Sequence, residues 1–331
     1  MLHDLQSQAG FVWVYRFDAE GRPHLLPRDK MPALELPDTS FVWLHVDLVH
    51  SRTKQWIAAC PGIPADALSL FLGQDEHQRL YHDADFVWGI TFDQMREVAS
   101  LADDTGMLHW IVSERVLLTG RRQALQATRL TRDALEAGFR ATSPVMLFER
   151  VIEYVIEDVA EDVMHLTDDT DSIEDHVIDD RIGNDARRLG LIRRRTVKLH
   201  RQLNGLHQLF RRFSETASAR TAPETVKSAA SRLLHRVDTM LSDVQIVQQR
   251  ARLLQDEIAA RLTAQTNEQL YVLSILTATL MPATLITGLF GVNTKGLPFL
   301  DDEMGFVYVV LLSLLAASLV YLLLRRRNMI H

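Results

Sequence analysis

The sequence predicts an α+β membrane protein in which an α/β domain, a long helical stalk and two C-terminal transmembrane helices follow one another. Two uncharged apolar runs near the C-terminus, residues 270–290 and 306–324, lead to the membrane assignment. Each run holds roughly 20 residues, which at about 1.5 Å per helical residue cross a hydrocarbon core of about 30 Å. A third observation is that strand-like patterns stop after Pro144, where helix-forming sequence begins.

The composition excludes several classes of function. The chain has 43 acidic and 36 basic residues, and its net charge of -7 opposes binding to nucleic acid, which is a polyanion. Its one cysteine, Cys60, cannot form an internal disulfide, which agrees with a reducing compartment. The first residues, Met1 to Gln6, have neither the basic patch nor the apolar segment of a secretory signal. We therefore expect the polar part of the chain to stay in the cytoplasm.

Residues 1–143 are predicted to form the cytoplasmic α/β domain. Short β-rich runs predict strands at 11–17, 41–47, 86–92, 107–112 and 115–120. Helical patterns fall at 51–60, 64–72 and 122–138. The domain has no phosphate-binding loop, dinucleotide fingerprint or nucleophile elbow, so we expect neither an enzyme nor a bound cofactor.

Residues 144–221 are predicted to form a hairpin of two helices whose charges are segregated by sign. The first helix carries Glu153, Glu157, Asp158, Glu161, Asp162, Asp168, Asp169, Asp171, Glu174, Asp175, Asp179 and Asp180. The second carries Arg187, Arg188, Arg193, Arg194, Arg195, Lys198, Arg201, Arg211 and Arg212. An antiparallel hairpin places the acidic helix beside the basic one. The charges form either solvated faces or an acidic surface that concentrates or senses cations.

Residues 222–290 are predicted to form one helix that runs from the stalk into the first span, with a loop at 291–304, a second span at 305–325 and a tail at 326–331. Pro223 suits the first turn of this helix after a Thr221 cap. Three arginines, Arg325 to Arg327, follow the second span, whereas the loop has only Lys295 against three carboxylates. By the positive-inside rule both termini are cytoplasmic and the loop faces outward.

The first span carries one narrow stripe of polar and small residues. Its members, at alternating steps of three and four, are Asn267, Leu270, Ser274, Thr277, Met281, Thr284 and Gly288. This spacing is the heptad seam of a left-handed helical bundle. Small and hydroxylated residues suit both an ordinary packing seam and the wall of a water-filled pore. Two helices per chain cannot enclose a channel, so a pore requires several chains around an axis lined by this seam.

The same spacing continues backward into the stalk. It takes in Thr263, Ala260, Asp256, Leu253, Gln249 and Ile246. In a bundle of several chains, Asp256 would form a ring of carboxylates below the pore, which is a candidate cation site. The alternative is a solvated stalk residue near Arg252 and Arg261.

At the outer end of the first span the string 281–293, with a second span close behind it, resembles the CorA superfamily of divalent-cation transporters. The resemblance covers the architecture of the whole chain. It implies a homopentamer with a cytoplasmic funnel, a pore lined by the first span and a Gly-Met-Asn signature at the outer mouth. Gly291, Val292 and Asn293 occupy that signature, with valine in place of methionine. Asn293 would then offer a ring of amide oxygens to a hydrated cation.

The loop after the signature resembles the ZntB branch of the superfamily, which is associated with zinc uptake into the bacterial cytoplasm coupled to protons. The acidic positions typical of the magnesium branch are replaced by Lys295 and Phe299. We therefore expect zinc uptake across a bacterial inner membrane, with Asp301, Asp302 and Glu303 attracting cations to the mouth. One alternative is a CorA-type channel for Mg²⁺, Co²⁺ or Ni²⁺. A second is a membrane-anchored scaffold or sensor that transports nothing.

Overall fold

A computed structural model of the protein describes residues 10–27, 40–60, 62–83, 85–95, 105–181, 183–219, 224–292, 298 and 304–327. The chain divides into two compact units, Met1–Leu254 and Gln255–His331. The first unit contains a β-sheet, its covering helices and a bundle of long helices. The second contains the end of the longest helix and the C-terminal helix.

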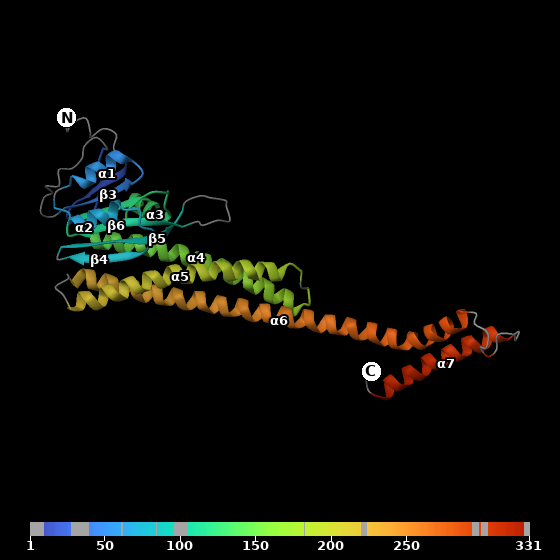
Figure 1. The fold of residues 1–331 in the computed structure, drawn as a ribbon. Helices are drawn as coiled ribbons and strands as arrows, with labels where there is room; N and C mark the ends of the chain where they lie inside the picture. The colour runs from blue at the N-terminus through green and yellow to red at the C-terminus, as the bar shows by residue number, and fades with distance from the viewer. Residues whose placement is uncertain are drawn as a thin grey trace. The chain divides into compact units, whose positions relative to one another are not determined.

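The first unit is built around a seven-stranded sheet (Figure 1). Its strands are β1 (Phe11–Phe17), β2 (Pro23–Leu25), β3 (Phe41–Asp47), β4 (Arg79–Asp83), β5 (Phe86–Gln94), β6 (Thr105–Ser113) and β7 (Val116–Arg121). The order across the sheet is β2-β1-β3-β7-β6-β5-β4. Only β3 and β7 pair in parallel; the other neighbours are antiparallel.

Helices cover both faces of the sheet, because its central strands carry apolar side chains on both faces. The short helices α1 (Ser51–Ala58) and α2 (Ala65–Leu72) bury Ile57 and Phe71 against one face. On the other face, α3 (Gln126–Glu136) and the first turns of α4 (Pro144–Ile178) pack on the strands, with the rings of Trp110 and Phe148 only 4.3 Å apart. Strands buried on two sides consist of nearly continuous apolar residues, which is why they were recognisable in the sequence.

All five predicted strands are present; β5 and β6 are two and three residues longer than predicted, and β7 is shifted by one residue. Two strands were missed, and both lie at an edge of the sheet. The strand β2 has only three residues and begins at Pro23, while β4 reads Arg-Leu-Tyr-His-Asp and stays partly exposed. An edge strand pairs on one side only, so it needs no apolar run. The predicted helix at 122–138 is shorter than expected, since α3 begins at Gln126.

The acidic and basic helices form the predicted antiparallel hairpin. The acidic helix α4 begins after Ser143, whose hydroxyl accepts a hydrogen bond from the Met146 amide. The basic helix α5 (Asp185–Ala219) runs back along it, and the first part of α6 (Glu224–Gly291) lies beside both (Figure 1). The proposed cap at Thr221 and Pro223 lies outside the described residues.

Two helices are long and apolar enough to cross a membrane among the residues that the structure describes. One is α6, whose 68 residues begin in the first unit and end in the second. The other is α7 (Gly305–Arg326), which carries Arg325 and Arg326 in its last turn. Both helices extend one residue beyond the predicted spans at their C-terminal ends.

Candidate ion pathway

Within the first unit, one face of α6 packs on its own chain. Leu233, Val237, Val244, Val247 and Ala251 recur at steps of three, four and seven residues, and each is no more than 3% exposed. Their partners are α4 and α5, which contribute apolar faces of their own. Such a spacing produces a straight apolar stripe on a helix of 3.6 residues per turn.

The opposite face of α6 carries the seam predicted from the sequence. Ile246 follows the buried Val244 by two positions, and Leu253 follows the buried Ala251 by two. Two residues turn the helix by about 200°, so both side chains point away from the buried face. Ile246 is 52% exposed and Leu253 is 68% exposed. Large aliphatic side chains in such an arrangement mark a surface that another molecule covers. The first unit thus leaves this side of the helix without a partner from the described part of its own chain.

In the second unit, all seven seam residues of the first span are exposed: Asn267, Leu270, Ser274, Thr277, Met281, Thr284 and Gly288. Three hydroxyls of this stripe donate to the backbone carbonyl one turn earlier: Ser274 to Leu270 at 2.7 Å, Thr277 to Leu273 at 2.8 Å and Thr284 to Leu280 at 3.0 Å. A hydroxyl whose proton is held in this way offers only its oxygen lone pairs to the surroundings. The stripe therefore presents acceptors, which suit the water shell of a cation.

The helix α6 ends at Gly291, the first residue of the signature. Val292 follows it and is 65% exposed. Asn293, which carries the predicted role at the outer mouth, lies outside the described residues. The same holds for Lys295 and for the acidic trio Asp301, Asp302 and Glu303. Their predicted roles remain predictions.

Asp256, the proposed carboxylate ring below the pore, is exposed on α6. Across the described part of the chain, no three His, Cys, Asp or Glu side chains come together in a way that could hold a metal ion. A metal site at Asp256 would therefore need carboxylates from other copies of the chain.

These features can be compared with known proteins. Residues 38–326 match the family model described as CorA-like Mg²⁺ transporter protein. The chain belongs to this CorA-like family. Its members are transporters rather than enzymes, so the alternative of a scaffold without transport falls away, and the chain is a divalent-cation transporter.

Three relatives illustrate the range of the CorA-like family. The divalent cation transporter CmaX of Pseudomonas aeruginosa is 24% identical over 314 residues, which are 92% of each chain. A solved structure of the full-length CmaX protein superposes on this chain with a TM-score of 0.81, covering 97% of this chain and 98% of that one. The zinc transport protein ZntB of Yersinia enterocolitica is 22% identical over 301 residues, 89% of this chain and 88% of that protein. The CorA magnesium transporter of Methanocaldococcus jannaschii has a TM-score of 0.76 at 16% identity, covering 96% and 99%.

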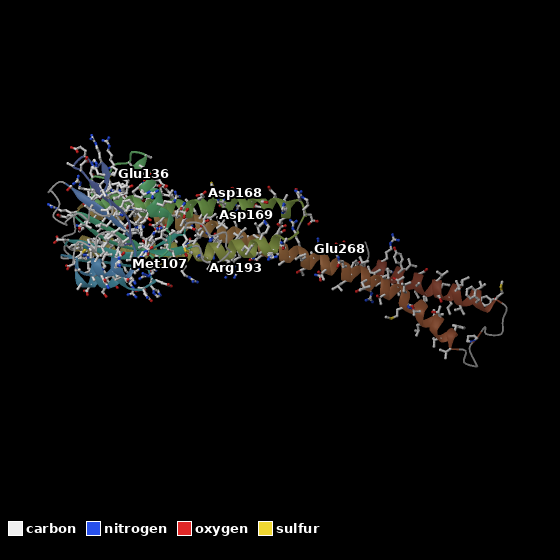
Figure 2. The ribbon with its side chains drawn as sticks, turned by 90° about the horizontal axis from the view of Figure 1, so that it is seen from above. Met107, Glu136, Asp168, Asp169, Arg193 and Glu268 are labelled. Atoms are coloured by element: carbon white, nitrogen blue, oxygen red, sulfur yellow. The ribbon has the colours of Figure 1, made fainter. Side chains whose placement is uncertain are left out.

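The acidic helix of this CorA-like chain is neutralised from two sides. Arginines of α5 form the first set of ion pairs, which include Arg188 with Asp169 at 3.0 Å and Arg195 with Asp162 at 2.9 Å. Figure 2 shows Asp168 and Asp169 on α4 and Arg193 on α5, along the same stretch of the hairpin.

The second source of positive charge is α6, which the sequence analysis missed. Arg232 forms a two-pronged pair with Glu149 at 2.6 and 2.7 Å, and Arg236 lies 3.3 Å from Glu153. Arg250 reaches both Asp171 at 2.6 Å and Glu174 at 2.5 Å. The sequence did contain a pattern that could have revealed this, because Arg232, Arg236 and Arg250 are spaced by four and fourteen residues and so lie on one flank of α6.

Two carboxyl groups turn inward and hold their protons more tightly than usual. Burial raises the pKa of Asp93 at the end of β5 from 3.8 to about 8, although both its oxygens accept from the Ala127 amide at 3.1 and 3.2 Å. Burial, together with the negative charges of Asp162 and Glu161, raises the pKa of Asp158 on α4 to about 6. At neutral pH the buried Asp93 therefore keeps its proton and adds little negative charge, whereas Asp158 is largely ionised.

Three histidines, His45, His200 and His207, have structural partners. His207 lies 2.9 Å from Asp238, and His200 lies 3.3 Å from the Gln245 side chain, so both connect α5 to α6. His45 is fully buried beside the Thr119 hydroxyl at 2.8 Å, and burial lowers its pKa well below the usual value. A histidine engaged in this way is a packing residue, and none of the three points to a zinc site.

Proposed function

We propose that this chain forms a homopentamer whose ion pathway runs along the exposed seam of α6. The observation that carries this proposal is the position of that seam, about 200° from the face that α6 buries in its own chain. Ile246 and Leu253, which are 52% and 68% exposed in the single chain, would be covered by neighbouring copies in such an assembly. The acceptor hydroxyls of Ser274, Thr277 and Thr284 would then line the centre of the bundle.

In this assembly the parts of the chain have separate tasks. Residues 1–143 and 144–221 would form the cytoplasmic funnel, 222–290 the stalk and pore helix, and 305–325 the outer helix of each subunit. Both termini, including the tail at 326–331, would lie in the cytoplasm of a bacterium, with the protein in the inner membrane. The loop at 291–304 would form the outer mouth.

At that mouth we propose that Gly291, Val292 and Asn293 form the first selective site. A small divalent ion gives up its water reluctantly, so neutral amide oxygens that bind the hydrated ion suit a first filter better than carboxylates that strip it. Asp301, Asp302 and Glu303 would offset the positive charge of Lys295 and raise the local cation concentration. Asp256 would add a weaker cation site at the inner end.

We propose zinc as the transported ion. The support is the printed function of relatives such as ZntB of Yersinia enterocolitica, together with Lys295 and Phe299 in place of acidic loop residues. Magnesium is the second candidate, because the CorA structure that this chain resembles is a magnesium transporter. The absence of His and Cys from residues 270–324 does not exclude zinc, since a conducting site must release its ion quickly.

Flux into proteoliposomes tests this proposal. Purified full-length protein is reconstituted, and uptake of Zn²⁺ and Mg²⁺ at equal concentrations is followed with trapped indicators, with and without an imposed pH gradient. We expect Zn²⁺ uptake to exceed Mg²⁺ uptake and to rise when the outside is more acidic. Faster Mg²⁺ uptake without a response to the gradient would assign the chain to magnesium transport. Liposomes without protein measure the leak of each ion.

Between residues 270 and 290 there is no Asp, Glu, His, Lys or Arg that could carry a proton. A response to the pH gradient would therefore have to be carried by pore water, by the ion's hydration shell or by groups outside the span. Equal Zn²⁺ flux with and without the pH gradient would show that transport is not coupled to protons, but it would still support zinc as the transported ion.

A further inference from the structure

A groove between α4 and α6 opens on the first unit and has no occupant in the described chain. Its volume is about 310 Å³, and its walls include Val163, Met164, Met240, Asp243 and Ile246. Met164 is 56% exposed and Ile246 is 52% exposed. The groove is thus apolar at its base and adjoins the seam that we assign to the pentamer axis. Its charged lining residues are Asp243 and Arg250, and the Arg250 guanidinium is already paired with Asp171 and Glu174.

The basic helix α5 carries a stripe that matches this groove. Arg187, Leu191, Arg194, Val197 and Arg201 recur along the side of α5 that faces away from its own buried residues. Leu191 is 55% exposed and Val197 is 38% exposed. Arg187, Arg194 and Arg201 make no ion pair within the described residues. Aliphatic side chains spaced among unpaired arginines are typical of a surface that docks on an acidic, partly apolar partner.

The acidic helix carries the complementary stripe. Glu161 and Asp168 lie three residues before and four residues after Met164, so all three share one side of α4. Glu161 is exposed and lies 3.9 Å from the exposed His165, and Asp168 is exposed as well. The negative stripe and the apolar groove are therefore parts of one surface.

The two surfaces lie at the same height along the hairpin. The pairs Asp162 with Arg195 and Asp169 with Arg188 fix the antiparallel register of α4 and α5. In that register Met164 is level with Arg193, which falls between Leu191 and Arg194. By the same register Glu161 is near the level of Arg194, and Asp168 is near the level of Arg187.

The two surfaces also flank α6 on different sides. Arg232, Arg236 and Arg250 join one flank of α6 to α4. Asp238 and Gln245 join another flank to α5 through His207 and His200. In a closed ring of identical subunits with the α6 seam toward the axis, the α4 flank of each copy meets the α5 flank of the next.

We propose that the α5 stripe of one copy docks in the α4–α6 groove of its neighbour, an inference that rests on the pentamer proposed above. Leu191 would lie against Met164 of the next copy, with Arg194 beside Glu161 and Arg187 beside Asp168. This contact explains why the hairpin segregates its charges by sign. An acidic flank and a basic flank on every subunit attract neighbours in one direction around the ring and oppose contacts between like flanks.

Directed cross-linking tests the contact in the full-length protein. In a Cys60→Ala background, one tagged form carries Met164→Cys and a differently tagged form carries Leu191→Cys, and the two are co-expressed and oxidised in membranes. We expect a disulfide between the two tags, and a ladder up to five chains when both substitutions are in one chain. Met146→Cys replaces Met164→Cys as the matched control. It lies eighteen positions earlier on α4, about 27 Å away along the helix, and should not cross-link.

Charge reversal provides an independent readout. We expect Arg194→Glu to lower the cross-linked fraction about fivefold, because an exposed attraction becomes a repulsion, and Glu161→Arg in the partner form to restore it. A pentamer by native mass without the cross-link, or equal cross-linking from position 146, would overturn the docking proposal alone. A monomer by native mass would overturn the pentamer and the docking together.

Discussion

Zinc flux through the Asn293→Ala protein should fall by more than about tenfold at low zinc concentration. The substitution removes a ring of five amide oxygens from the proposed outer site. If each acceptor contributes about 0.5 kcal/mol to holding the hydrated ion, the ring contributes about 2.5 kcal/mol, or roughly seventyfold in occupancy. The measurement is initial Zn²⁺ uptake into proteoliposomes that contain matched amounts of pentamer.

Two comparisons make this result specific. Asn204→Ala removes an amide from helix α5 of the first unit and should leave the flux unchanged. Asn293→Gln keeps the amide but displaces it, and should give an intermediate flux. If Asn293→Ala conducts as well as the unmodified protein at limiting zinc, the assignment of Asn293 to the outer site is wrong.

The second large effect is expected from Leu253→Lys in the stalk. Leu253 is 68% exposed on the seam face of α6, and assembly would bury it against its counterparts. The substitution forfeits about 2 kcal/mol of apolar burial in each chain and brings five positive charges together near the axis. We expect the pentamer to dissociate in mild detergent and the flux to be lost, as measured by native mass and uptake.

Val49→Lys is the matched control, because Val49 is 65% exposed on the sheet domain rather than on the α6 seam. That protein should remain pentameric and active. Leu253→Met conserves the burial and should also assemble. A Leu253→Lys protein that keeps its full mass would show that this face of α6 does not meet other copies.

The parts of the structure that could be predicted from sequence are those with strong periodicity. The strands β3, β5 and β7 are buried on both faces, so their apolar runs were visible. The long helices and the α6 seam repeat a spacing over many turns, and in the first unit the seam residues Ile246, Gln249 and Leu253 lie on an exposed side of α6. Local patterns of this kind depend only on the helix or strand itself.

Other parts depend on partners distant in sequence and could not be predicted in the same way. The edge strand β4 is defined by its pairing with β5, in which Gly89 lets the two backbones and the Trp110 ring come close. The arginines of α6 pair with carboxylates of α4 that are 76 or more residues away in the sequence, so these pairs depend on the packing of the bundle. The same holds for the raised pKa of Asp93, which follows from complete burial that its sequence neighbours do not reveal.

In the candidate ion pathway, too, some features could be predicted from the sequence and others could not. The spacing identified which side of α6 is special, but it could not distinguish a packing seam from a pore wall. The structure adds that the chain's own helices cover the opposite side, which favours a role between copies. Asn293 and the acidic loop lie outside the described residues, so the proposed outer mouth rests on the sequence signature.

The most direct test of the α6 pathway is block of flux by a thiol reagent at single cysteines in the Cys60→Ala background. Thr284→Cys lies on the seam, and its neighbour Leu285→Cys, which is 64% exposed, lies off it. A water-soluble methanethiosulfonate added outside should block Zn²⁺ flux through Thr284→Cys and spare Leu285→Cys. Block at Leu285→Cys with Thr284→Cys unaffected, or equal block at both, would contradict a pore lined by this face of α6.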